Sequence, residues 1–271
     1  MTGIFYEHIA EGAEQSGISL REALSKARGM GYEGLECDLW RLQTPGTAKP
    51  DKAVKDLFDC HDMRVISVYS CYDFPHEGKE KCREKYLPHI EAAAFLGAEK
   101  ILCVPGFFRQ GDDRDECMER TAQRLLEMCE AAKGYGITVM IEDFDDIGSP
   151  CCRTSQLEYL SGNVPGLGVA FDTGNFAYCC EDAMEAYGKL RDRVIHVHLK
   201  DRTWEQGCGK KEDISGRKMF ACPAGDGFIG IRDIIKRLRA DGYSGDFSVE
   251  HFGADDQMRF MERSLENLSD I

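Results

Sequence analysis

Four polar residues occupy equivalent places in the sequence, each at or next to the end of a short apolar segment typical of a buried strand. They are Glu142, Asp172, His198 and Glu250. A carboxylate or an imidazole in such a place is costly unless another group pairs with it. Together they form a mixed oxygen and nitrogen ligand set. We therefore predict that they converge on one divalent metal, with Mn²⁺ as the first choice and Mg²⁺, Co²⁺ and Zn²⁺ as alternatives.

The segments that position these residues alternate between apolar runs and stretches of helical period. A capping box at Ser19 and Glu22 predicts a helix that ends at 29–31. Further helices are predicted near 49–61, 78–96, 112–133, 153–161, 181–190, 230–241 and 256–268, and a long loop at 201–228. Strands are predicted at 4–6, 34–38, 64–69, 100–104, 139–142, 167–172, 194–199 and 246–250.

Eight strand–helix units at a spacing of about thirty residues favour a (β/α)₈ barrel, with residues 1–271 as one domain. An open doubly wound sheet is the competing fold, but it calls for a glycine-rich phosphate motif after the first strand. The sequence EHIAEG at 7–12 is not such a motif. In a barrel the carboxyl ends of the strands carry the chemistry, and the four residues above are predicted to lie there.

Five short motifs in this order resemble one family. They are IEDF at 141–144, FDTGN at 171–175, HVHLKD at 196–201, AGDG at 224–227 and VEHF at 249–252. The chain is similar over essentially its whole length to the sugar phosphate isomerases and epimerases with a xylose isomerase-like barrel. The resemblance implies a metal held by Glu142, Asp172, His198 and Glu250. It also implies that Glu142 and Glu250 act as acid and base on opposite faces of a bound ketose or sugar phosphate.

That chemistry is proton removal next to a carbonyl group, through an enediolate that a metal stabilises. Lys200, two residues after His198, is expected to face inward and to bind an anionic group or steady an enolate. Three further substrate-binding candidates are Asn175, His8 and Tyr69. We expect His196 to be structural and His251 to face the helices. Phe107, Phe108, Trp204 and Phe252 are candidates, with Tyr69, to line a dry pocket.

Three other functions remain open at this stage. The same barrel and metal set would serve a dehydratase of a cyclic keto-polyol, of the inosose or 3-dehydroshikimate type. An apurinic-site endonuclease is a poorer match, because Asn175 stands where a further histidine is needed and the segment 224–230 lacks an Asp-x-His pair. A barrel that binds sugars without turnover is the third. Intact Glu142 and Glu250 argue against it.

Composition limits the partners. Lys and Arg total 34 against 48 Asp and Glu, so the formal net charge of −14 disfavours nucleic acid and anionic membranes. The first residues do not resemble a signal peptide, and we expect a cytoplasmic protein. The 13 cysteines include no C-x-x-C pair, which indicates reduced thiols packed as small apolar groups. By resemblance alone, a homodimer or homotetramer is expected.

Overall fold

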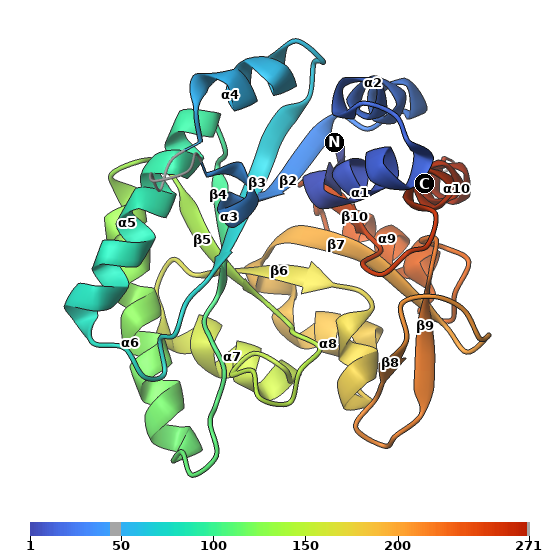
Figure 1. Cartoon of the computed structure of the whole chain (residues 1–271). Coiled ribbons are helices and arrows are strands. Elements are labelled where there is room, and N and C mark those ends of the chain that lie inside the picture. Colours follow the sequence, from blue (N-terminus) through green and yellow to red (C-terminus); the bar gives the residue numbers. More distant parts are fainter. Residues whose placement is uncertain (44–49, 270–271) are drawn as a thin grey trace.

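Eight parallel strands close into a barrel, as the sequence predicts (Figure 1). The computed structural model describes residues 1–43 and 50–269. The last barrel strand pairs with the first on one side and with the seventh on the other, which closes the ring. The strands are β1 (Thr2–Phe5), β2 (Gly34–Asp38), β3 (Arg64–Cys71), β4 (Lys100–Val104), β5 (Thr138–Glu142), β6 (Gly168–Asp172), β7 (Val194–Thr203) and β10 (Phe247–Glu250).

Helices surround this ring, and α10 packs on α1 and α2 (Figure 1). Ser19 caps α2 by accepting a hydrogen bond from the Glu22 amide, as its sequence predicts. The predicted helix start at residue 49 lies outside the described residues. The helices are α1 (Tyr6–Ser16), α2 (Leu20–Met30), α3 (Leu39–Leu42), α4 (Lys52–Asp59), α5 (Lys79–Leu96), α6 (Arg114–Lys133), α7 (Thr154–Asn163), α8 (Ala183–Leu190), α9 (Ile231–Ala240) and α10 (Gln257–Leu268), with the 3₁₀ segments η1 (Asn175–Cys179) and η2 (Arg191–Arg193).

The structure differs from the sequence prediction at three places, the first of which is the short unpredicted helix α3 directly after β2. Helix α1 starts at Tyr6, directly after β1, so Tyr6 and His8 are helical and do not end a strand. The predicted loop 201–228 contains an extension of β7 and two short strands, β8 (Lys211–Glu212) and β9 (Lys218–Cys222). These pair antiparallel and form a hairpin that projects from the barrel (Figure 1).

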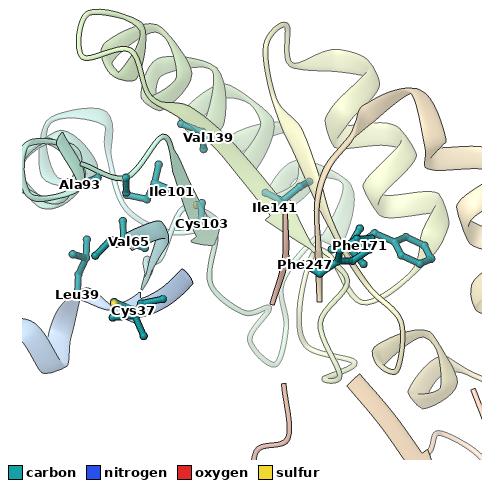
Figure 2. Packing of buried hydrophobic residues seen from close by; sticks show 14 of the residues in the cluster. Cys37, Leu39, Val65, Ala93, Ile101, Cys103, Val139, Ile141, Phe171 and Phe247 are labelled. Atoms are coloured by element: carbon teal, nitrogen blue, oxygen red, sulfur yellow. The ribbon is translucent and has the colours of Figure 1, made fainter. Parts of the chain in front are cut away.

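Side-chain alternation along the strands divides the interior into two regions. Figure 2 shows part of the larger region, between strands and helices, where Ile101, Val139 and Ile141 pack among buried apolar side chains. The residues between them on the same strands, Leu102 and Met140, belong to a separate small cluster. Glu142 is two residues beyond Met140 and shares its face of the sheet. The same period of two therefore places the polar residues toward the barrel axis.

All 13 cysteines are free, as predicted, and most of them are buried among apolar side chains. No helix within residues 1–43 and 50–269 has the length and apolar character needed to cross a bilayer.

Candidate metal centre

The structure brings Glu142, Asp172, His198 and Glu250 together at one end of the barrel. Each offers one ligand atom, and these four atoms all lie within 4.8 Å of one another. The three carboxylates end β5, β6 and β10, and the histidine lies in β7. All four side chains are buried. We call them the quartet.

Contacts around the quartet leave a buried oxygen of Asp172 without a hydrogen bond. The Nδ1 atom of His198 contacts Oε1 of Glu142 and lies 3.4 Å from Oε2 of Glu250. Asp172 Oδ1 accepts hydrogen bonds from the amides of Gly174 and Asn175, at 2.6 and 2.9 Å. Its other oxygen, Oδ2, is buried and accepts none. Three carboxylates, an imidazole and an orphaned inward oxygen fit a divalent cation.

Lys200 provides one positive charge beside these carboxylates. Its Nζ atom lies 2.5 Å from Oε1 of Glu250 and 3.7 Å from Oδ2 of Asp172. Burial alone would raise the pKa of Glu250, but Lys200 and His198 together lower that pKa below its ordinary value. Burial raises the pKa values of Glu142 and Asp172, because desolvation penalises their charged forms. One ammonium therefore balances the three carboxylates incompletely.

Glu36 of β2, which is not a member of the quartet, lies within hydrogen-bond distance of the Nε2 atom of His198. Its Oε2 atom lies 3.0 Å from Nε2 of His198, 3.0 Å from Nε2 of His196 and 2.9 Å from Oγ of Ser248. His196 is fully buried in this network, which agrees with its predicted structural role. Glu36 was not among the predicted site residues. Its inward position in β2 was the available signal, but its contact with His198 depends on how the barrel closes.

A cavity of about 470 Å³ opens beside the quartet. Glu142 and Glu250 line it, and so do three of the predicted substrate-binding residues, Tyr69, Asn175 and Lys200. The side-chain nitrogen Nδ2 of Asn175 donates a hydrogen bond to the backbone carbonyl of Asp143 at 2.8 Å. The side-chain oxygen Oδ1 of Asn175 is buried without a hydrogen bond. That free acceptor would suit a substrate hydroxyl group.

His8 does not line this cavity, which corrects its predicted position at the end of a strand. Because it lies on α1, its Nε2 atom accepts a hydrogen bond from the His251 amide at 3.0 Å, and the two rings stack. His251 also contacts Phe260 of α10, in line with its expected orientation toward the helices.

The aromatic lining was predicted in part. Phe252 lines the cavity with Tyr69, but Phe107, Phe108 and Trp204 do not. Trp204 instead stacks on Phe228, with their ring centroids 3.9 Å apart. The remaining walls include residues that the sequence did not single out, namely Phe5, Phe144, Asp145, Arg202, Lys210 and Lys211.

A closed (β/α)₈ barrel that gathers carboxylates and an imidazole at the carboxyl ends of its strands defines a class of barrel proteins with an acidic centre. Residues 24–270 match the family model described as Xylose isomerase-like TIM barrel, so the chain belongs to this family. The family agrees with the resemblance found in the sequence motifs.

Two curated relatives are inosose dehydratases. The one from Clostridium perfringens (strain 13 / Type A) is 39% identical over 218 residues, covering 73% of this chain and 73% of the relative. The one from Lacticaseibacillus casei is 23% identical over 253 residues, covering 86% and 82%. The chain therefore has enzymes among its relatives.

Solved structures support the fold. The probable 3-DHS dehydratase AsbF from Bacillus anthracis has a TM-score of 0.72 at 17% identity, covering 93% of this chain and 94% of its own. A D-tagatose 3-epimerase-like protein has a TM-score of 0.74 at 21% identity, covering 99% and 97%. The IOLI protein, solved with a zinc atom, has a TM-score of 0.76 at 16% identity, covering 99% and 96%.

Proposed function

We propose that the protein is a divalent-metal-dependent dehydratase of a small cyclic keto-polyol. The observation that carries the proposal is the convergence of the quartet beside a cavity with room for one such substrate. The sequence alone put an epimerase or isomerase first. We now place dehydration first, because the two relatives described above, which align over most of the chain, are inosose dehydratases.

The quartet would hold the metal. A bound divalent cation would supply Lewis-acid stabilisation of the negative charge that develops on the carbonyl oxygen, worth several kcal/mol. The positive charge of Lys200, beside Glu250 and Asp172, would stabilise the same charge from within the chain. Phe5, Phe144 and Phe252 line the cavity and would exclude water, which strengthens both effects.

Glu250 and Glu142 are assigned the proton transfers. Glu250, held as a carboxylate by Lys200, would take the proton from the carbon next to the carbonyl group. The electron pair left behind forms a carbon–carbon double bond and expels the hydroxyl group on the next carbon. Glu142, which reaches the cavity from β5, would protonate that hydroxyl so that it leaves as water. Such acid–base catalysis contributes about 10²–10⁴-fold.

Substrate orientation is assigned to the polar lining. The free Oδ1 of Asn175 would accept a hydrogen bond from a substrate hydroxyl group. Tyr69 also lines the cavity, where its aromatic ring provides an apolar surface and its hydroxyl group a polar one. His8 has no direct role in this proposal. Its bond to the His251 amide instead anchors the residue next to Glu250.

The test uses purified protein loaded in turn with Mn²⁺, Mg²⁺, Co²⁺ or Zn²⁺. Each form is supplied with an inosose or with 3-dehydroshikimate, and formation of a conjugated, ultraviolet-absorbing product is followed. Glu250→Gln and Glu142→Gln are expected to lower the rate by at least about 10²-fold. Metal-loaded wild type without turnover of any keto-polyol would contradict the proposal.

Epimerisation of a ketose is the second candidate. It is favoured by the presence of both Glu142 and Glu250 in the cavity lining, on strands separated by β6 and β7, because an epimerase needs a proton acceptor and a donor on different sides of one carbon. Ketoses and ketose phosphates incubated in deuterium oxide separate the two candidates. Epimer formation with label at one carbon and no absorbing product would favour the epimerase.

A further inference from the structure

We propose a second metal site at the mouth of the barrel, formed by His76, Asp112 and Cys117. We call these residues the rim trio. Each offers one ligand atom, and the three atoms lie within 4.8 Å of one another. His76 lies between β3 and α5, Asp112 precedes α6, and Cys117 is in the first turns of α6. None of them lines the catalytic cavity, so the site goes beyond the proposed function.

The imidazole of His76 is held in the arrangement found at metal-binding histidines. Its Nδ1 atom lies 2.6 Å from Oδ1 of Asp73, and the other oxygen of Asp73 accepts from Arg109 at 2.5 Å. Its Nε2 atom lies 2.8 Å from Oδ2 of Asp112. A histidine ligand commonly donates its second nitrogen to a carboxylate, which fixes the ring and its tautomer. Asp73 is that carboxylate for His76, so the Nε2 atom of His76 remains available to bind the ion.

Cys117 supplies a sulfur atom as the third ligand of the site. Its side chain is fully buried, and Nη2 of Arg120 lies 3.1 Å from Sγ. Arg120 is itself anchored, because its Nε atom donates to the carbonyl oxygen of Pro75 at 2.7 Å. Metal binding by cysteine takes place through the thiolate, and the Arg120 guanidinium would lie beside it. Arg120 also connects Cys117 to the segment that carries His76.

The charges of the site would balance around a divalent ion. The Asp112 carboxylate and the Cys117 thiolate carry two negative charges, and the neighbouring Asp73 and Arg109 form a neutral pair. The two ring nitrogens of His76 lie 2.6 Å from Oδ1 of Asp73 and 2.8 Å from Oδ2 of Asp112.

The ligand types indicate a borderline-soft ion such as Zn²⁺. Nitrogen, oxygen and sulfur together suit Zn²⁺, which takes four tetrahedral ligands, whereas Mg²⁺ and Ca²⁺ require oxygen ligands. The side chains of His76 and Asp112 are 14% and 17% exposed, so the ion can enter from solvent and water can take the fourth position. The bound ion would join the segment after β3 to the start of α6.

Cobalt chloride tests the proposal, because a thiolate bound to Co²⁺ gives an intense sulfur-to-metal charge-transfer absorption and the quartet contains no cysteine. Wild type is expected to bind two Co²⁺ per chain and to show this absorption. Cys117→Ser should lose the charge-transfer absorption and should bind one Co²⁺ fewer per chain. Cys129→Ser, which changes another buried cysteine of α6, is the matched control and should retain both.

Two further variants keep the outcome clear. His76→Gln changes a partly exposed side chain and should also lose one equivalent, so the test does not depend on the folding of Cys117→Ser. Glu142→Gln with Asp172→Asn should lose the other equivalent and keep the charge-transfer absorption. Neither readout involves turnover, so a failure of the proposed catalysis would leave this test intact. Cobalt-loaded wild type without a thiolate absorption, or Cys117→Ser that retains it, would overturn the proposal.

Discussion

The Nε2 atom of His198 lies 3.0 Å from Oε2 of Glu36, while Nδ1 of the same ring faces Glu142 and Glu250. A buried carboxylate on one side of the imidazole thus directs its other nitrogen to the centre of the quartet. His196 and Ser248 hold the same Glu36 oxygen. Glu36 is therefore a positioning residue for His198.

Glu36→Gln is expected to weaken metal binding by about 10- to 100-fold, because it removes the charge that orients His198. Isothermal titration with Mn²⁺ or Zn²⁺ measures the change. Ser248→Ala is the matched control, since it removes one hydrogen bond to the same oxygen and keeps the carboxylate. Its effect should be several-fold smaller. Equal affinity of Glu36→Gln and wild type would show that Glu36 does not act through His198.

Lys200→Met is expected to cost stability chiefly when metal is absent. The ammonium is the closest cationic partner of Glu250, and removing one member of a buried pair costs roughly 3–5 kcal/mol. A metal held by the quartet would supply replacement charge, so the loss in the free energy of unfolding should shrink in saturating metal. Urea unfolding with a chelator and with Mn²⁺ compares the two states. An equal loss in both would count against a metal in the quartet.

Glu7→Gln should change how stability depends on pH. Burial raises the pKa of Glu7 to about 7, from an ordinary value of 4.5. Between these two pH values the folded protein keeps a proton that the unfolded chain has lost, so the wild-type free energy of unfolding falls as pH rises from 4.5 to 7. Below pH 4.5 and above pH 7, the contribution of Glu7 to the free energy of unfolding does not change with pH.

Removing this group should therefore make Glu7→Gln more stable relative to wild type as pH rises through that window, by up to roughly 3 kcal/mol. Urea unfolding of both proteins across the window measures the difference. Glutamine can still accept the hydrogen bond that Glu7 receives from the Asp38 amide. If the free energies of unfolding of the two proteins changed in parallel with pH, the raised pKa of Glu7 would be refuted.

Gly227→Ala should disrupt the turn that follows β9. An added Cβ would lie 2.2 Å from Oδ1 of Asp201 and 2.3 Å from the Arg202 carbonyl oxygen, so backbone must move. The Asp201 carboxylate accepts from the amides of Gly225, Gly227 and Ile229, at 2.9, 3.0 and 3.2 Å. We expect a loss of at least about 1–3 kcal/mol.

Gly188→Ala provides the comparison, because a Cβ there meets no atom within 4 Å and the residue lies in α8. Alanine in a helix interior is expected to stabilise by up to about 1 kcal/mol. Thermal and urea unfolding of the two variants should thus shift in opposite directions. A Gly227→Ala protein as stable as wild type would mean that the turn tolerates a side chain.

The barrel could be predicted because the alternation of strands and helices is a local pattern, and the convergence of the quartet followed because a barrel brings the carboxyl ends of its strands to one face. The apolar run 139–141 is followed by Glu142, which ends the strand. The period of two along a strand then places Glu142 on the same face of the sheet as Met140. The β8–β9 hairpin was missed because KE and KMFAC are short and sit among glycines and charged residues. Helix α1 was missed because no turn residue separates it from β1, which misplaced His8. Glu36 and the rim trio require contacts between distant segments, which no local pattern encodes.

Strand β10 supplies Glu250 and is the last barrel strand in the sequence, and it lies between β1 and β7. During synthesis, a partly emerged chain presents at most three of the four ligands to the ions around it. The full set therefore exists only after β10 has been synthesised and has paired with β1 and β7.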